Sequence, residues 1–173
     1  MSNVASRLGT ATQYIRDLNV AIRKGEIKVP QFQRPFVWDE DDAIQLLDSI
    51  SNNYPIGSLL LWKTKDKLTT ERNIGDFQLP ETDDLSPTDY VLDGQQRLTV
   101  IYSALGAEPD VKGFAAFYDL DKSSFTANRR KEQALHLFPL RWLYQTSKLL
   151  NFRTALQAHA KASSLQERLD AFG

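Results

Sequence analysis

Polar residues with chemical potential follow directly on an apolar run in the middle of the chain. The segment 93–97 reads Asp-Gly-Gln-Gln-Arg and comes after Tyr-Val-Leu at 90–92, a run typical of a strand. A helical pattern begins immediately afterwards. A glycine between a strand and a helix allows a tight turn, and the free N–H groups of the helix's first turn then point at a ligand with a favourable dipole. The spacing therefore predicts an anion site at residues 93–97.

The charged residues of this segment have distinct chemistry. Asp93 lies at the strand end, where a carboxylate can hold a divalent cation, orient a water or accept a proton. Arg97 offers a planar, permanently charged fork that suits phosphate oxygens. A structural role is the alternative. An arginine in a helix's first turn opposes the dipole, so a purely structural Arg97 would need a carboxylate partner, for which Asp93 is the candidate.

An earlier cluster, QFQRPFVW at residues 31–38, follows a predicted strand at 27–30. Arg34, with Gln33 beside it, is placed to be a second phosphate ligand if that strand lies next to residues 90–92 in the sheet. Phe36 and Trp38 are interpreted as core residues rather than as platforms for stacking bases.

The elements that must position these residues alternate between strands and helices. We expect an α/β domain with a small mixed sheet flanked by helices and a helical C-terminal extension, divided as residues 1–125 and 126–173. The expected helices cover 10–24, 40–53 after an N-cap at Asp39, 95–105 closed by Gly106, and most of the chain after 128 with a break at Pro139. The expected strands are 27–30, a buried strand at 57–63, 90–92, 114–120 and a short one at Phe125, while 64–89 is mostly loop with an edge strand near Phe77.

Composition limits the function classes. The chain has 173 residues, enough for one domain with a real core, and it has no cysteine and only two histidines. Disulfides and thiolate metal sites are excluded, and a histidine-rich zinc or HNH nuclease centre is not expected. A net charge of −1 opposes strong nonspecific nucleic-acid binding. The N-terminal sequence has no signal peptide pattern and no run is long enough to span a bilayer, so we expect a cytoplasmic protein without membrane contact.

Three blocks in order, VPQFQRPFVW, PIGSLLLW and YVLDGQQRLTVIYSAL, resemble the N-terminal domain of GmrSD-type restriction endonucleases. The same domain occurs in phosphorothioate-sensing defence proteins. The resemblance covers residues 15–120 and extends to the ParB/sulfiredoxin-like superfamily. There an early Gln-Arg pair and a later Gly-x-x-Arg surround a nucleotide, and these match residues 33–34 and 94–97.

The resemblance implies a module that binds and hydrolyses a nucleoside triphosphate with Mg²⁺. The module would belong to a type IV-like anti-phage restriction system acting on modified DNA. The implied catalytic residues are Asp93, which would also bind the metal, Gln96 and Arg97. The implied nucleotide-binding residues are Gln33, Arg34, Gly57, Ser58, Gly94, Gln95 and Thr99.

The implied partners are modified phage DNA and an HNH-type nuclease domain or subunit, and a homodimer is a further option. The chain itself has no HNH-like constellation of His and Asn. We therefore expect a fragment, a subunit with a partner or a degenerate copy, and no DNA cleavage by the domain alone. The alternative function is a ParB-like switch that binds nucleotide or DNA without catalysis and gates a partner nuclease.

Overall fold

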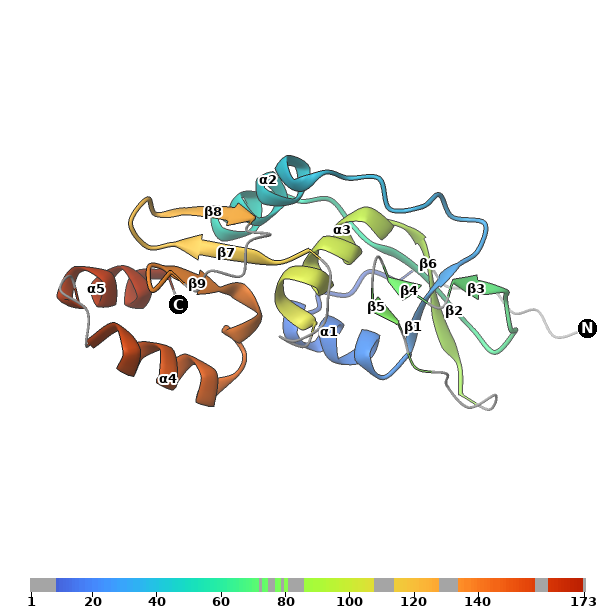
Figure 1. The fold of residues 1–173 in the computed structure, drawn as a ribbon. Coiled ribbons are helices and arrows are strands. Elements are labelled where there is room, and N and C mark those ends of the chain that lie inside the picture. The colour runs from blue at the N-terminus through green and yellow to red at the C-terminus, as the bar shows by residue number, and fades with distance from the viewer. Residues whose placement is uncertain are drawn as a thin grey trace, which may run out of the picture.

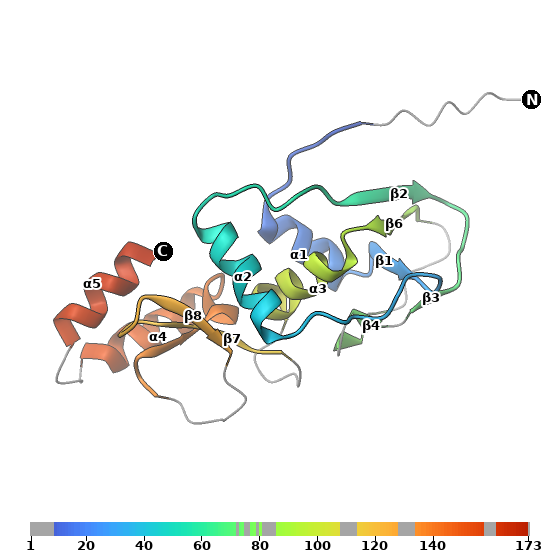
Figure 2. The same cartoon turned by 90° about the horizontal axis from the view of Figure 1, so that it is seen from above.

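A computed structural model describes residues 9–71, 73–74, 77–78, 80, 86–107, 114–127, 134–157 and 162–172. Within these residues the strands form a four-stranded sheet, a three-stranded sheet and a two-stranded ribbon. The two larger sheets lie side by side along the molecule, with helices packed between and around them (Figures 1 and 2). The site depends on how the first of these sheets is ordered.

The first sheet contains β1 (Ile27–Pro30), β2 (Leu60–Thr64), β3 (Thr70–Glu71) and β6 (Thr88–Asp93) in the order β2-β6-β1-β3. β1 runs parallel to β6, with Ile27 opposite Asp89, whereas β2 is antiparallel to β6. Because β1 and β6 are parallel neighbours, their carboxyl ends meet at one edge of the sheet. The condition on which the proposed role of Arg34 depended, that the first strand lies next to residues 90–92, is therefore met.

β2 corrects the prediction of a buried strand at 57–63. The strand begins at Leu60, and its residues are half-buried or exposed, with Leu60 44% and Trp62 40% exposed. The reason is its position at the edge of the sheet, where, among the described strands, β6 is its one neighbour. An apolar run does not distinguish a central strand from an edge strand. The Trp62 ring packs against the Tyr90 ring, with the ring centroids 6.5 Å apart.

The ribbon consists of β4 (Asn73–Ile74) and β5 (Phe77–Gln78), which confirms the edge strand expected near Phe77. β3 and β4 were not predicted, because a two-residue strand has no periodicity to detect.

The helices that precede Ala116 lie close to the positions predicted from the sequence. The helices are α1 (Ile15–Arg23), α2 (Glu40–Ser51), α3 (Gln95–Ile101) and its π-helical continuation η1 (Tyr102–Gly106). The N-cap predicted at Asp39 is confirmed as a capping box: its carboxylate accepts the Asp42 N–H at 2.9 Å, and the Asp42 carboxylate accepts the Asp39 N–H at 3.3 Å. α1 begins later than predicted, at Ile15, and buries Leu18 and Ile22 against the core.

The C-terminal half corrects the prediction of a wholly helical region after residue 128. β9 (Leu137–Pro139) completes a sheet with β7 (Ala116–Asp119) and β8 (Ser124–Ala127), in the order β8-β7-β9. A three-residue strand ending at Pro139 is too short to show a period. The 3-10 turn η2 (Leu140–Trp142), α4 (Thr146–Gln157) and α5 (Ala162–Phe172) follow. This sheet spans residue 125, and the domain division there stays a prediction.

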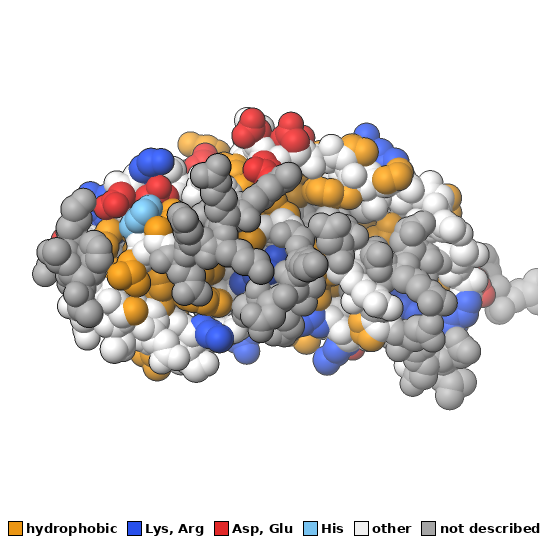
Figure 3. Space-filling view, in the orientation of Figure 1, with side chains coloured by type: hydrophobic (Ala, Val, Ile, Leu, Met, Phe, Trp, Pro, Cys, Tyr) orange, Lys and Arg blue, Asp and Glu red, His pale blue; other side chains and the backbone are white. Residues whose placement is uncertain are grey.

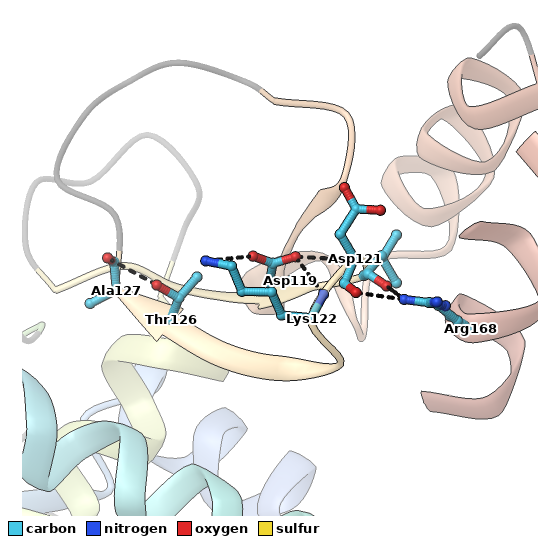
Figure 4. A network of polar contacts seen from close by, with 7 residues as sticks. Asp119, Asp121, Lys122, Thr126, Ala127 and Arg168 are labelled. Atoms are coloured by element: carbon cyan, nitrogen blue, oxygen red, sulfur yellow. Dashed lines mark hydrogen bonds and ion pairs between the residues drawn. The ribbon is translucent and has the colours of Figure 1, made fainter. Parts of the chain in front are cut away.

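Polar contacts fix this second half. Asp119, at the end of β7, accepts the backbone N–H groups of Asp121 and Lys122 at 2.9 and 3.1 Å (Figure 4). Arg168 of α5 donates to the carbonyls of Leu120 and Asp121, both at 2.7 Å. The β7–β8 turn is therefore closed by its own aspartate and held to the last helix by an arginine.

Arg141 of η2 links the C-terminal part of the chain to η1 and β5. Its guanidinium is buried and donates to the carbonyl oxygens of Ser103 at 3.1 Å and Phe114 at 2.7 Å, and it lies 5.6 Å from the centre of the Phe77 ring. Burial lowers the pKa of Arg141 from its ordinary value, although arginine stays protonated at neutral pH.

The architecture confirms the predicted fold class, a small mixed α/β domain with helices at its C-terminal end. Its likeness to the ParB/sulfiredoxin fold stays a prediction. None of the described helices has the length and apolar character needed to cross a membrane.

Candidate functional site

A cavity of about 540 Å³ opens where β1 and β6 end. Its walls come from the loop after β1, from α2, from the loop before β2, and from the β6–α3 turn. Ligands in α/β folds bind at the carboxyl ends of parallel strands, which is where this cavity lies. It is lined by Gln33, Arg34, Trp38, Asp42, Gln45, Leu46, Ser49, Ile56, Asp93, Gly94, Gln95, Gln96 and Arg97.

The β6–α3 turn depends on Gly94. Its φ of 90° is in the left-handed region, and a side chain there would meet Leu59 and Arg97. Gly94 is the N-cap of α3 and offers no side-chain cap, so the first N–H groups of the helix are not satisfied by a capping side chain. The turn therefore combines backbone donors with the Asp93 carboxylate, whose side chain is 72% exposed.

Arg97 extends from α3 toward the loop before β2. Its Nη1 donates to the Ile56 carbonyl at 2.6 Å, and its Nη2 lies 3.3 Å from the Asp93 carboxylate. Gly57, at φ 81°, is required here as well, because a Cβ at that position would collide with the Arg97 guanidinium. Asp93 is the carboxylate partner that a structural Arg97 would need. The Arg97 guanidinium has five N–H donors, and these two contacts use two of them.

The side chains of Gln96 and Gln33 form hydrogen bonds with backbone groups around the cavity. The Gln96 side-chain oxygen accepts the N–H groups of Val37 at 2.9 Å and Trp38 at 3.3 Å, and its amide donates to the Pro35 carbonyl at 3.0 Å. Gln33 donates to the Leu92 carbonyl at 3.0 Å. With 6% exposure and both ends of its amide engaged, Gln96 positions the β1–α2 loop over the turn.

Arg34 lines the cavity with an exposed side chain that has no hydrogen-bond or ion-pair partner in the described part of the chain. It is therefore a charge available to an anionic ligand. Trp38 and Phe36 both pack against the core, as predicted, and Trp38 also contributes to the cavity wall.

The structure brings together most of the residues predicted for the site and leaves others outside. Ser58 and Thr99 are not on the cavity wall, and Thr99 is buried within α3 at 2% exposure. Gly57 acts through its contact with Arg97 rather than on the wall itself. The residues that do line the cavity are Gln33, Arg34, Asp93, Gly94, Gln95, Gln96 and Arg97.

Sequence reasoning missed the wall supplied by α2. Asp42, Gln45 and Ser49 face the cavity at intervals of three and four residues, which is one face of a helix. That spacing was visible in the sequence. What could not be seen was that the polar face of α2 lies beside the β6–α3 turn rather than in open solvent.

Acidic groups are distributed unevenly. The residues at the start of α2 form an acidic surface, visible over this helix in Figure 3. This surface consists of Asp39, Glu40, Asp41 and Asp42. Across the described ranges, no three Asp, Glu or His side chains converge in a way that could hold a metal ion.

Two comparisons with known proteins accompany this geometry. A family model described as the N-terminal domain of GmrSD restriction endonuclease matches residues 15–169. An uncharacterized protein of Methanocaldococcus jannaschii is 31% identical over 123 residues, which are 64% of this chain and 21% of the relative. The chain thus spans about a fifth of the length of that curated relative.

Proposed function

The chain belongs to the family of GmrSD restriction endonuclease N-terminal domains, and from this premise we propose that its cavity binds and hydrolyses a nucleoside triphosphate. The observation that carries the proposal is the meeting of Arg34, Arg97 and Asp93 at the ends of two parallel strands. The cavity's volume of about 540 Å³ lies within the range of about 300–1,000 Å³ for small-molecule sites.

The phosphates are assigned to the cationic side of the cavity. Arg34 has no hydrogen-bond or ion-pair partner among the described residues, and Arg97 retains N–H donors beyond those it gives to Ile56 and Asp93. Backbone N–H groups at the start of α3 add donors without adding charge. Together these groups stabilise the negative charge that concentrates on the transferred phosphoryl group.

Asp93 is assigned to the attacking water. Its carboxylate orients the water and accepts its proton while the oxygen attacks the terminal phosphorus; the bond to the leaving oxygen breaks, and a nucleoside diphosphate and phosphate are released. Asp93 also fits one ligand of Mg²⁺, which is commonly held by one or two carboxylates together with substrate phosphates. When bound with the nucleotide, Mg²⁺ supplies charge that offsets the phosphate oxygens.

At the level of the system, we assign the domain to the restriction of modified phage DNA. Nucleotide turnover here would control cleavage by an HNH-type nuclease domain or subunit.

The test measures nucleotide binding and phosphate release by the full chain, with and without modified DNA. We expect Arg34→Ala to weaken triphosphate binding at least tenfold, and Asp93→Ala to abolish turnover while binding persists. Arg16→Ala, which removes an exposed arginine on α1 outside the cavity, is the matched control. If the wild-type chain neither binds nor hydrolyses any triphosphate under these conditions, the proposal fails.

A switch without catalysis is the second candidate, and the contacts of Arg97 favour it specifically. Arg97 holds the loop before β2 through the Ile56 carbonyl and is itself held by Asp93. A phosphate that drew Arg97 away would release that loop without any bond being broken. Calorimetry that shows tight binding with no turnover, together with ligand-dependent dimerisation, would select this candidate.

A further inference from the structure

We infer that the α2 wall of the cavity, centred on Gln45, recognises the nucleoside part of the ligand and sets the preference among bases. The α2 wall is defined as Asp42, Gln45, Leu46 and Ser49. This inference rests on the proposed function, since it concerns the other end of the same ligand.

Charge orients the ligand. Both arginines of the cavity come from outside α2, whereas the α2 wall contains an aspartate and no cation. The other three residues of the acidic surface, Asp39, Glu40 and Asp41, add further negative charge beside it (Figure 3). A triphosphate is repelled by this helix and attracted to Arg34 and Arg97, so the uncharged nucleoside is left to face α2.

The polar groups of the α2 wall match a nucleoside in kind. Gln45 is exposed and its amide has no partner in the described part of the chain, so it offers a donor and an acceptor to a base edge. The Ser49 hydroxyl donates to the Gln45 backbone carbonyl at 2.9 Å, which leaves its oxygen free to accept. Next to them, Trp38, Leu46 and Ile56 provide the apolar surface on which a flat ring packs.

Gln95 supplies an independent sign of a polar ligand. Its side-chain oxygen is buried on the cavity wall and receives no hydrogen bond from any described residue. Unsatisfied buried acceptors are rare in proteins. A ribose hydroxyl placed between the phosphates and the base would donate to this oxygen.

The experiment compares four nucleoside triphosphates with inorganic tripolyphosphate, which has the charge and no nucleoside. We expect Gln45→Ala to weaken nucleotide binding by roughly three- to tenfold, the loss of about one hydrogen bond, and to leave tripolyphosphate binding unchanged. Arg34→Ala should weaken both. Asn52→Ala, which removes an amide from the C-cap of α2 outside the cavity, is the matched control.

Gln45→Glu sharpens the test, because a carboxylate accepts hydrogen bonds and cannot donate them. The ratio of affinities should shift toward adenine, cytosine and guanine, which present an amino group, and away from uracil, which has none. Ratios are compared because the added charge weakens every triphosphate alike. Nucleotide affinity that is unchanged in Gln45→Ala, together with affinity ratios that are unchanged in Gln45→Glu, overturns this inference alone. A wild-type chain that binds neither nucleotide nor tripolyphosphate overturns the proposed function with it.

Discussion

Two of the described strands end in an aspartate, and the two carboxylates differ in their exposure and in their partners. Asp93 ends β6 with 72% of its side chain exposed, whereas Asp119 ends β7 with 5% exposed. After Asp119 the backbone turns back, so that the N–H groups of Asp121 and Lys122 both donate to one carboxylate oxygen while the Lys122 ammonium lies 3.7 Å from the other. After Asp93 a left-handed glycine leads the backbone into α3, and the hydrogen-bond partner of the Asp93 carboxylate among the described residues is the Arg97 side chain. The turn that follows the strand thus decides whether the aspartate carboxylate is bound by backbone N–H groups, as at Asp119, or stays exposed to a ligand, as at Asp93.

The largest effect expected from this comparison is on catalysis. Asp93→Asn should lower phosphate release at least about a hundredfold, the usual contribution of a positioned general base, while thermal stability stays nearly constant. Stability is spared because the Asp93–Arg97 pair is largely solvent-exposed on the aspartate side, and such pairs contribute about 0–1 kcal/mol. Turnover equal to wild type would remove Asp93 from the mechanism.

Asp119→Ala should show the reverse pattern. It leaves two backbone N–H groups of the β7–β8 turn without their acceptor, at a cost of about 1–3 kcal/mol in the free energy of unfolding. Urea titration measures this loss as a lower midpoint. Nucleotide affinity should be unaffected, and a variant that unfolds normally but binds nucleotide poorly would contradict the division between the two aspartates.

A smaller effect should follow from Gly57→Ala, which tests whether Arg97 depends on its neighbour. The left-handed φ of 81° costs a residue with a side chain about 1–2 kcal/mol, and the added Cβ displaces the guanidinium. We expect a few-fold weaker binding of tripolyphosphate along with this loss of stability. Gly9→Ala is the matched control, since nothing lies within 4 Å of a Cβ there.

The smallest effect is expected at Arg168, the arginine that contacts the turn after Asp119. Arg168→Ala removes the donor to the Leu120 and Asp121 carbonyls, but the side chain is exposed and water replaces it. The free energy of unfolding should fall by less than about 1 kcal/mol. A loss above that of Asp119→Ala would mean that α5, rather than the aspartate, closes the turn.

Local signals in the sequence predicted the positions of the site's main elements. The capping aspartate at 39, the strand at 27–30 and the strand–glycine–helix sequence around Gly94 are each short-range features, and the structure has each of them. The chemistry of Asp93 and Arg97 could be proposed on the same basis. Both the phosphate role and the structural alternative foreseen for Arg97 remain compatible with its contacts.

Features that depend on distant parts of the chain were not predictable. The exposure of β2 follows from its place at the sheet edge, and the α2 wall follows from packing against the β6–α3 turn. The clamp made by Gln96 joins residues 59 apart, so no local pattern indicates it. Nor does sequence spacing show that Thr99 and Ser58 fall outside the cavity.

The bonds of Gln33 and Gln96 also set the order in which the site can be made. Each joins positions separated by 58 to 61 residues. Closing a loop of that length costs roughly 3–4 kcal/mol of chain entropy before any contact rewards it. A chain emerging from the ribosome cannot make the cavity until residue 97 has been released, although α1, α2 and β1 are complete long before. Binding competence should therefore be acquired late and in a single step, when the β1–α2 loop and the β6–α3 turn meet.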